Sequence, residues 1–187
     1  DFTTAAYVQL LDSAARRFRF LNYAAAEMDG SENICLWRHD VDISPQRALA
    51  LARLEAERGI RATYFVQTGS EIYNAFARDN KRCFREIAAM GHWIGLHFDA
   101  GAWPDPAQVE QGILREAEAL RHLLQVDIDT VSLHNPATYD ASRFTAPRLA
   151  GLLNGTSTTF RDHWTYCSDS NGLWRFRHLQ DVIDDPA

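Results

Sequence analysis

Short β-forming runs alternate along this chain with longer stretches of helical periodicity. The runs cover residues 34–37, 62–66, 93–97 and 130–133, and residues 166–168 are a further candidate. Strands that are separated by helices favour an α/β fold with a largely parallel sheet or barrel. A length of 187 residues fits one domain with a sizeable core, so we expect a single domain over residues 1–187.

Helix signals lie between these runs. Ser44 and Asp105 each precede a proline, which is the arrangement of an N-cap followed by the first helical residue. We expect one helix over residues 4–17, one from Ser44 to Gly59, one that ends at Gly91 and one that begins at Asp105. The last of these carries a regular apolar stripe at positions 109, 113, 117, 120 and 124.

Composition excludes several classes of protein. The chain is 46% hydrophobic and 24% charged, an ordinary globular balance, and its net charge of −6 argues against nucleic-acid binding. No apolar run approaches the roughly 20 residues of a transmembrane segment, and no charged segment followed by an apolar one suggests a secretion signal. Cys35, Cys83 and Cys167 form neither a CxxC pair nor a disulfide framework, so we expect a reducing, cytoplasmic location.

The predicted strands end in acids, imidazoles and amides. These residues are Asp40, Asp42, His97, Asp99, His134, Asn135 and Asp169. In parallel α/β folds the carboxyl ends of the strands carry the chemistry. A structural ion pair could account for any one of these strand ends but not readily for all of them, so the pattern predicts a metal-assisted active site.

Asp40 and Asp42 flank Val41, so both carboxylates project to the same face of an extended segment. Two close carboxylates push their pKa values apart unless a cation lies beside them. One acid can then bind a metal ion while the other accepts a proton from water. The alternative is that one acid caps the helix near Ser44 and the other pairs with Arg38, which accounts for one Asp better than for two.

Three histidines near the predicted strands have different expected roles. His97 ends an apolar strand, where its imidazole can face the same edge of the sheet as the two acids. His134 follows another strand and is the best second imidazole. His92 follows Gly91, and we expect it to be a structural, hydrogen-bonding residue near the end of a helix.

Four blocks of this sequence resemble the polysaccharide deacetylase family, carbohydrate esterase family 4. They are RHDVDISP at 38–45, ATYF at 62–65, GHWIGLH at 91–97 and SLHNP at 132–136. The resemblance extends from about residue 35 to about residue 174, with the blocks in the family's order. It looks closest to a divergent, bacterial branch that is associated with surface-polysaccharide synthesis.

The resemblance implies a distorted (β/α) barrel of about seven strands. It also implies a metal-dependent hydrolase that removes an acetyl group from an N-acetylated sugar or polysaccharide precursor, acting on a C–N bond other than a peptide bond. Asp40 matches the family's catalytic base, Asp42 its metal-binding Asp, and His97 its first metal-binding His. The expected cofactor is a divalent metal ion, zinc first, and Asn135 and Trp103 are the expected sugar contacts.

The chain departs from the family's pattern at several positions. Gly101 stands where the family has its second metal-binding His, so either Asp99 or His134 completes the site or the metal binds weakly, and we favour His134. The His134 block is one in which the family more usually has an Arg. Residues 166–170 are similar to the fourth block, in which an acid orients the site, so Asp169 is expected to orient the ligands or to replace one of them. The family's late His has no clear counterpart, because His178 matches poorly; either the chain stops short of that block or the protein lacks the group.

Two other classes of protein compete with the deacetylase. His97-Phe98-Asp99 followed by His134 satisfies the pattern of a two-histidine, one-carboxylate iron site, although such oxygenases generally have all-β folds. A non-catalytic carbohydrate-binding domain on a degenerate deacetylase fold is the stronger alternative, and its best support is Gly101 together with the missing late His. The presence of both Asp40 and Asp42 favours an enzyme, because a binding module needs one acid or neither.

Overall fold

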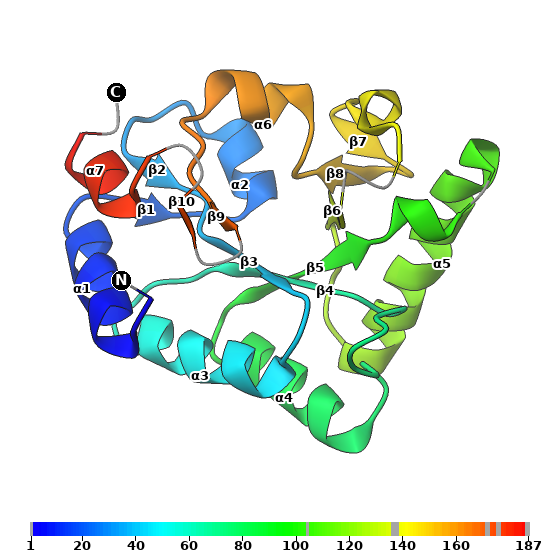
Figure 1. The fold of residues 1–187 in the computed structure, drawn as a ribbon, viewed down its shortest axis with the longest axis horizontal. Helices are drawn as coiled ribbons and strands as arrows, with labels where there is room; N and C mark the ends of the chain where they lie inside the picture. The colour runs from blue at the N-terminus through cyan, green and yellow to red at the C-terminus, as the bar shows by residue number, and fades with distance from the viewer. Residues whose placement is uncertain (1, 104, 136–138, 171–172, 175–176, 186–187) are drawn as a thin grey trace.

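The computed structural model describes residues 2–103, 105–135, 139–170, 173–174 and 177–185 (Figure 1). Six strands form its central sheet in the order β3-β4-β5-β6-β8-β7. Their bounds are β3 (Arg38–Val41), β4 (Thr63–Val66), β5 (Trp93–Phe98), β6 (Thr130–Leu133), β7 (Arg148–Leu149) and β8 (Leu152–Asn154). All neighbours pair in parallel except β7 and β8. This confirms the predicted α/β fold with a mostly parallel sheet, whereas a closed barrel of about seven strands is not shown within the described residues.

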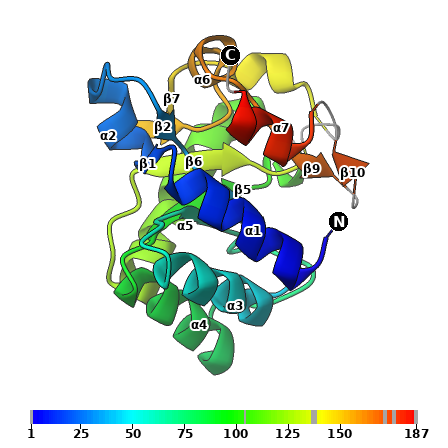
Figure 2. The same cartoon turned by 90° about the vertical axis from the view of Figure 1, so that its left-hand side faces the viewer.

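Helices cover the sheet on both sides. Figures 1 and 2 show α3 and α4 on one side and α2 and α6 on the other, with α1 and α7 side by side at one end. The bounds are α1 (Thr4–Ala15), α2 (Tyr23–Met28), α3 (Pro45–Ala56), α4 (Arg78–Ala89), α5 (Pro106–Leu124), α6 (Thr158–His163) and α7 (Leu179–Asp184). Within the described residues, no helix has both the length and the apolarity to cross a bilayer.

The remaining short elements lie outside the central sheet. They are β1 (Arg19–Phe20) paired with β2 (Ile34–Cys35), β9 (Asp169–Ser170) paired with β10 (Leu173–Trp174), and the 3-10 helices η1 (Ala100–Ala102) and η2 (Ala141–Phe144).

The helix signals in the sequence are confirmed. The Ser44 hydroxyl accepts the Arg47 N–H at 3.3 Å and caps α3, and the Asp105 carboxylate accepts the Ala107 N–H at 2.9 Å and caps α5. The apolar stripe of α5 is buried. Gly91 follows α4 with a φ of 92°, a conformation that glycine adopts without strain.

Two predicted strands were placed wrongly. Only Ile34–Cys35 of the run at 34–37 is a strand, and it pairs with β1 outside the central sheet; the strand of the central sheet is β3, four residues later than the predicted start. The charged β3 residues are tolerated because Arg38 pairs with Asp40 and His39 pairs with Glu55. The run at 166–168 precedes β9, which begins at Asp169.

A contact across the sheet shows that it is strongly curved. The Arg38 guanidinium of β3 donates to the Ser132 hydroxyl of β6, and it lies 4.6 Å from the centre of the Phe65 ring of β4. In a flat sheet three strand spacings of about 4.8 Å would separate β3 from β6, which is farther than an arginine side chain reaches. The sheet therefore curls around this inner face and brings the ends of β3, β5 and β6 together.

Gly95 in β5 leaves room for the Phe65 ring on this inner face. A Cβ atom at Gly95 would lie 2.5 Å from Phe65 Cε1 and 3.2 Å from the Thr130 carbonyl oxygen. We expect Gly95→Ala to lower the free energy of unfolding by about 1–3 kcal/mol, because the core would be overpacked beneath Arg38. Urea unfolding measures the change, with Gly30→Ala as a control that meets no atom within 4 Å. Equal unfolding midpoints for the two variants would contradict this packing.

Candidate metal centre

Three side chains converge where β3, β5 and β6 end. Asp42 Oδ1 lies 3.3 Å from His97 Nε2 and 3.3 Å from His134 Nδ1, and the two histidine nitrogens are 3.2 Å apart. Among the described residues, this triangle is the group of acid, His or Cys side chains whose ligand atoms are spaced to hold an ion. The predicted set of Asp42, His97 and His134 is thus brought together by the fold.

The contact of His97 Nδ1 with a backbone carbonyl leaves its Nε2 able to face a cation. His97 is buried, and its Nδ1 lies 3.3 Å from the Ser132 carbonyl oxygen, an acceptor to which it can donate a proton. In that tautomer the Nε2 lone pair faces the Asp42 Oδ1 acceptor and His134 Nδ1, and His134 Nδ1 is a third acceptor when its own proton lies on Nε2. Three acceptors that face one another repel unless a cation or a shared proton lies between them.

The size of the triangle also fits a metal ion. When ligand bonds are about 2.0 Å long in a tetrahedral complex, neighbouring ligand atoms lie about 3.3 Å apart. The three separations here are 3.2–3.3 Å. One carboxylate and two imidazoles with a remaining position suit a catalytic divalent ion such as zinc, and the backbone carbonyl on His97 is the usual partner of a metal-binding imidazole.

Asp40 lies beside the triangle but is held by a different partner. Arg38 Nη2 donates to both of its carboxylate oxygens, at 2.6 and 2.8 Å, and Asp40 Oδ2 is 3.9 Å from His97 Nε2. Burial by itself would raise the pKa of Asp40, but the Arg38 charge and then His97 outweigh it and leave the pKa below its usual range. Asp40 is therefore an ionised carboxylate at neutral pH.

The pKa of Asp42 is lowered for a similar reason. Partial burial would raise this pKa, but when no ion is bound His97 can carry a second proton on Nε2, and its hydrogen bond and charge then lower the pKa further than burial raises it. The alternative in which one acid caps the helix near Ser44 is wrong, since Ser44 itself caps α3. Its other half, the pairing with Arg38, is correct for Asp40.

Gln67 belongs to the site and was missed in the sequence. Its side-chain nitrogen lies 2.7 Å from Asp42 Oδ1 and 3.3 Å from His134 Nδ1, and the residue is buried. Gln67 directly follows β4, so it occupies the same strand-end position as the predicted ligands. Its strand-end position could have identified Gln67 in the sequence. It was overlooked because an uncharged amide is not a typical metal ligand.

Two predicted substitute ligands lie elsewhere. Asp99 caps η1, where its Oδ1 accepts the Gly101 N–H at 2.9 Å, and Asp169 is an exposed residue of β9. Neither belongs to the triangle. The histidine–Asp99 iron pattern is therefore not assembled, because the acid that joins His97 and His134 is Asp42.

The two predicted sugar contacts have different surroundings. Trp103 stacks on Phe98 with ring centroids 6.1 Å apart and packs over Gly112 of α5, as a packing aromatic does. Asn135 is exposed next to His134, with a φ of 44°. Asn135 thus stays at the edge of the site, and both assignments remain predictions.

His92 has the structural role expected from the sequence. Its Nδ1 accepts the Ala62 N–H at 3.1 Å, and its Nε2 lies 2.9 Å from the Ala52 carbonyl oxygen. The ring is buried behind the sheet and takes no part in the triangle.

Comparison with known proteins connects this architecture to a deacetylase. No family model matches the chain, and no curated protein matches its sequence. The structure of IcaB from Ammonifex degensii is similar, with a TM-score of 0.52 and 18% identity over 75% of this chain and 71% of that chain. The Streptococcus pyogenes deacetylase PplD, in complex with acetate, has a TM-score of 0.55 and 15% identity over 79% of this chain and 77% of that chain. The predicted resemblance is confirmed at the level of the fold.

Proposed function

We propose that this chain is a polysaccharide deacetylase-like enzyme that uses a divalent metal ion to remove the acetyl group from an N-acetylated sugar or polysaccharide precursor. Zinc is the first candidate for this ion. One observation carries the proposal. The Asp42–His97–His134 triangle, with ionised Asp40 beside it, lies at the strand ends of a fold shared with a deacetylase. Fold similarity alone would not imply chemistry, but this set of side chains supplies it.

The triangle residues and Asp40 would have different roles in the reaction. Asp42, His97 and His134 would hold the ion, which when bound would activate water and polarise the acetyl carbonyl. Asp40 would accept the proton of the attacking water, because Arg38 keeps it ionised and orients both of its oxygens. The water oxygen would form the new C–O bond first, the C–N bond to the sugar would then break, and the proton that Asp40 accepted would pass to the leaving nitrogen, so that the products are acetate and a free amine.

Arg38 supports this division by its other contacts. Besides Asp40 it donates to the Ser132 hydroxyl and lies over the Phe65 ring, so the guanidinium is fixed on three sides. Ser132 also provides the carbonyl that faces His97 Nδ1. The base and the first imidazole are therefore positioned by the same residue of β6.

Acetate release tests the proposed function. The metal-loaded protein is incubated with N-acetylated monosaccharides, sugar nucleotides and oligosaccharides, and acetate is measured with and without a chelator. We expect acetate from at least one member of the panel, a return to background after chelation, and recovery when zinc is added. Sugar binding without acetate from any member would instead favour the carbohydrate-binding module.

A further inference from the structure

Gln67 is anchored between β4 and the end of β3. Its backbone N–H donates to the Tyr73 hydroxyl at 3.0 Å, and that hydroxyl donates to the Val41 carbonyl at 2.8 Å. The Gln67 residue is 6% exposed, so its side-chain amide has little access to bulk water. A buried amide of this kind needs partners within the protein.

The partners of the Gln67 amide are two of the three atoms of the triangle. Its nitrogen lies 2.7 Å from Asp42 Oδ1 and 3.3 Å from His134 Nδ1. A side-chain amide has two N–H groups. In this arrangement one faces the carboxylate oxygen and the other faces the imidazole nitrogen.

An ion in the triangle would take one of these two acceptors from the Gln67 amide. His134 Nδ1 has one lone pair, which the ion would take, whereas Asp42 Oδ1 keeps a second lone pair for Gln67. One amide hydrogen would then lose its acceptor in a buried place, and such a loss is unfavourable. An oxygen atom of a ligand that enters beside the ion would restore the missing acceptor.

We propose that Gln67 has two tasks in the metal-loaded protein: one amide hydrogen orients Asp42, and the other donates to the carbonyl oxygen of the acetyl group or to acetate. This role rests on the metal site of the proposed function and assigns the oxygen-binding side of that site. A donor aimed at an oxygen that becomes negatively charged stabilises the transition state more than the substrate.

Metal and acetate binding test this role without turnover. Cobalt(II) is titrated into wild type and Gln67→Leu to obtain its affinity, and acetate is then titrated at saturating cobalt while the visible absorption is followed. We expect Gln67→Leu to weaken cobalt binding by about 10–100-fold. We expect acetate binding at saturating cobalt to weaken by about 10-fold, the loss of one hydrogen bond to a charged group. Gln46→Leu, which removes an exposed glutamine that donates to Asn80 at 2.8 Å, is the control and should change neither value.

Each outcome is decisive. Wild-type affinity for both ligands in Gln67→Leu would overturn the role, and so would weaker cobalt binding with unchanged acetate binding. Wild-type protein that binds no cobalt would overturn the metal site itself and the proposed function with it. If near-ultraviolet circular dichroism shows that Gln67→Leu is unfolded, Gln67→Asn is used instead. This variant shortens the side chain by one methylene and should lower the affinity for both cobalt and acetate.

Discussion

Asp40→Asn is expected to lower the rate of acetate release by about 10²–10⁴-fold while the protein keeps its metal ion. An amide cannot accept the proton of the attacking water, whereas the triangle of Asp42, His97 and His134 does not include Asp40. The rate is measured by acetate release, and the metal content of the same preparation by elemental analysis.

Asp42→Asn is the matched comparison. It removes the anionic ligand that lies 3.3 Å from each histidine nitrogen, so metal content and activity should fall together. Equal metal loss in Asp40→Asn and Asp42→Asn would contradict the proposal that Asp40 is the base and Asp42 the metal ligand.

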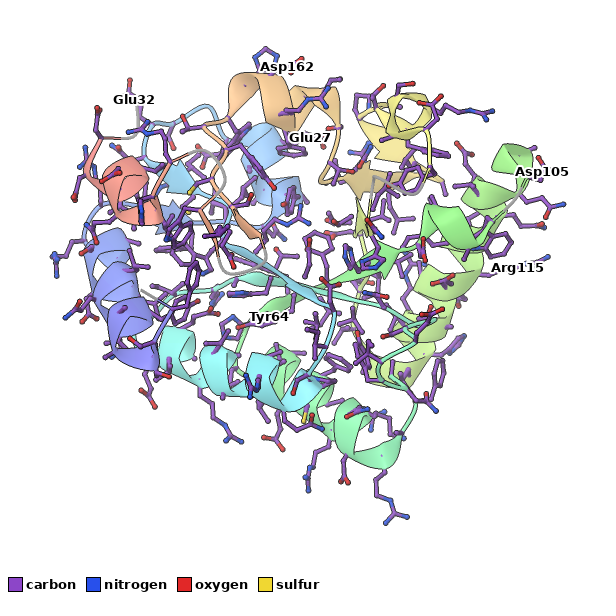
Figure 3. All side chains as sticks on the ribbon, viewed as in Figure 1. Glu27, Glu32, Tyr64, Asp105, Arg115 and Asp162 are labelled. Carbon is purple, nitrogen blue, oxygen red and sulfur yellow. The ribbon has the colours of Figure 1, made fainter. Side chains whose placement is uncertain are left out.

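Glu55→Leu is expected to lower the free energy of unfolding by about 3–5 kcal/mol. Glu55 is fully buried in α3 and accepts hydrogen bonds from Tyr7, from Tyr64 at 2.8 Å and from His39 at 2.6 Å. Figure 3 shows Tyr64 between the sheet and α3. Leucine would remove the acceptor that these three donors share. Urea unfolding measures the effect, with exposed Glu57→Leu as the control, and similar values for both would contradict it.

The Glu55 cluster also predicts a pH dependence of stability. Burial would raise the pKa of Glu55, but the His39 charge and the three hydrogen bonds outweigh it and lower the pKa below its usual value. A carboxylate with a lowered folded pKa stabilises the fold fully above its unfolded pKa, about 4.3, and loses this contribution as the pH falls. The difference in stability between wild type and Glu55→Gln should therefore shrink from pH 7 toward pH 3.

The parts of the fold with strong local signals were predictable. Capping residues and apolar periodicity located α3 and α5, and apolar runs located β4, β5 and β6. β3 was misplaced because Arg38, His39 and Asp40 read as a polar loop, and only their partners in the fold neutralise them. The two-residue strands β7, β9 and β10 are too short to show any periodicity.

The three residues of the triangle could be predicted because strand ends meet at one edge of a parallel sheet. Asp42, His97 and His134 each carry a side chain of known metal chemistry at such an end. Arg38 was considered only as an ion-pair partner, since its reach to Ser132 depends on the curvature of the sheet. Glu55 was not distinguished from the surface acids of its helix, because its partners come from α1, β3 and β4.

The alternation of side chains along β3 also protects the strand against mispairing. Arg38 and Asp40 face the inner side of the curved sheet, while His39 between them faces Glu55. A slip of one residue against β4 would exchange the two faces and turn His39 toward the site; in one of the two directions it would place Asp40 beside Glu55. Asp40 would then replace the His39 imidazole as the neighbour of buried Glu55, and Glu55 would lose its ion-pair partner, which is unfavourable. The amount of zinc bound after refolding would therefore report whether β3 pairs with β4 in the correct register. Secondary-structure content would not report this, because a slipped strand is still a strand.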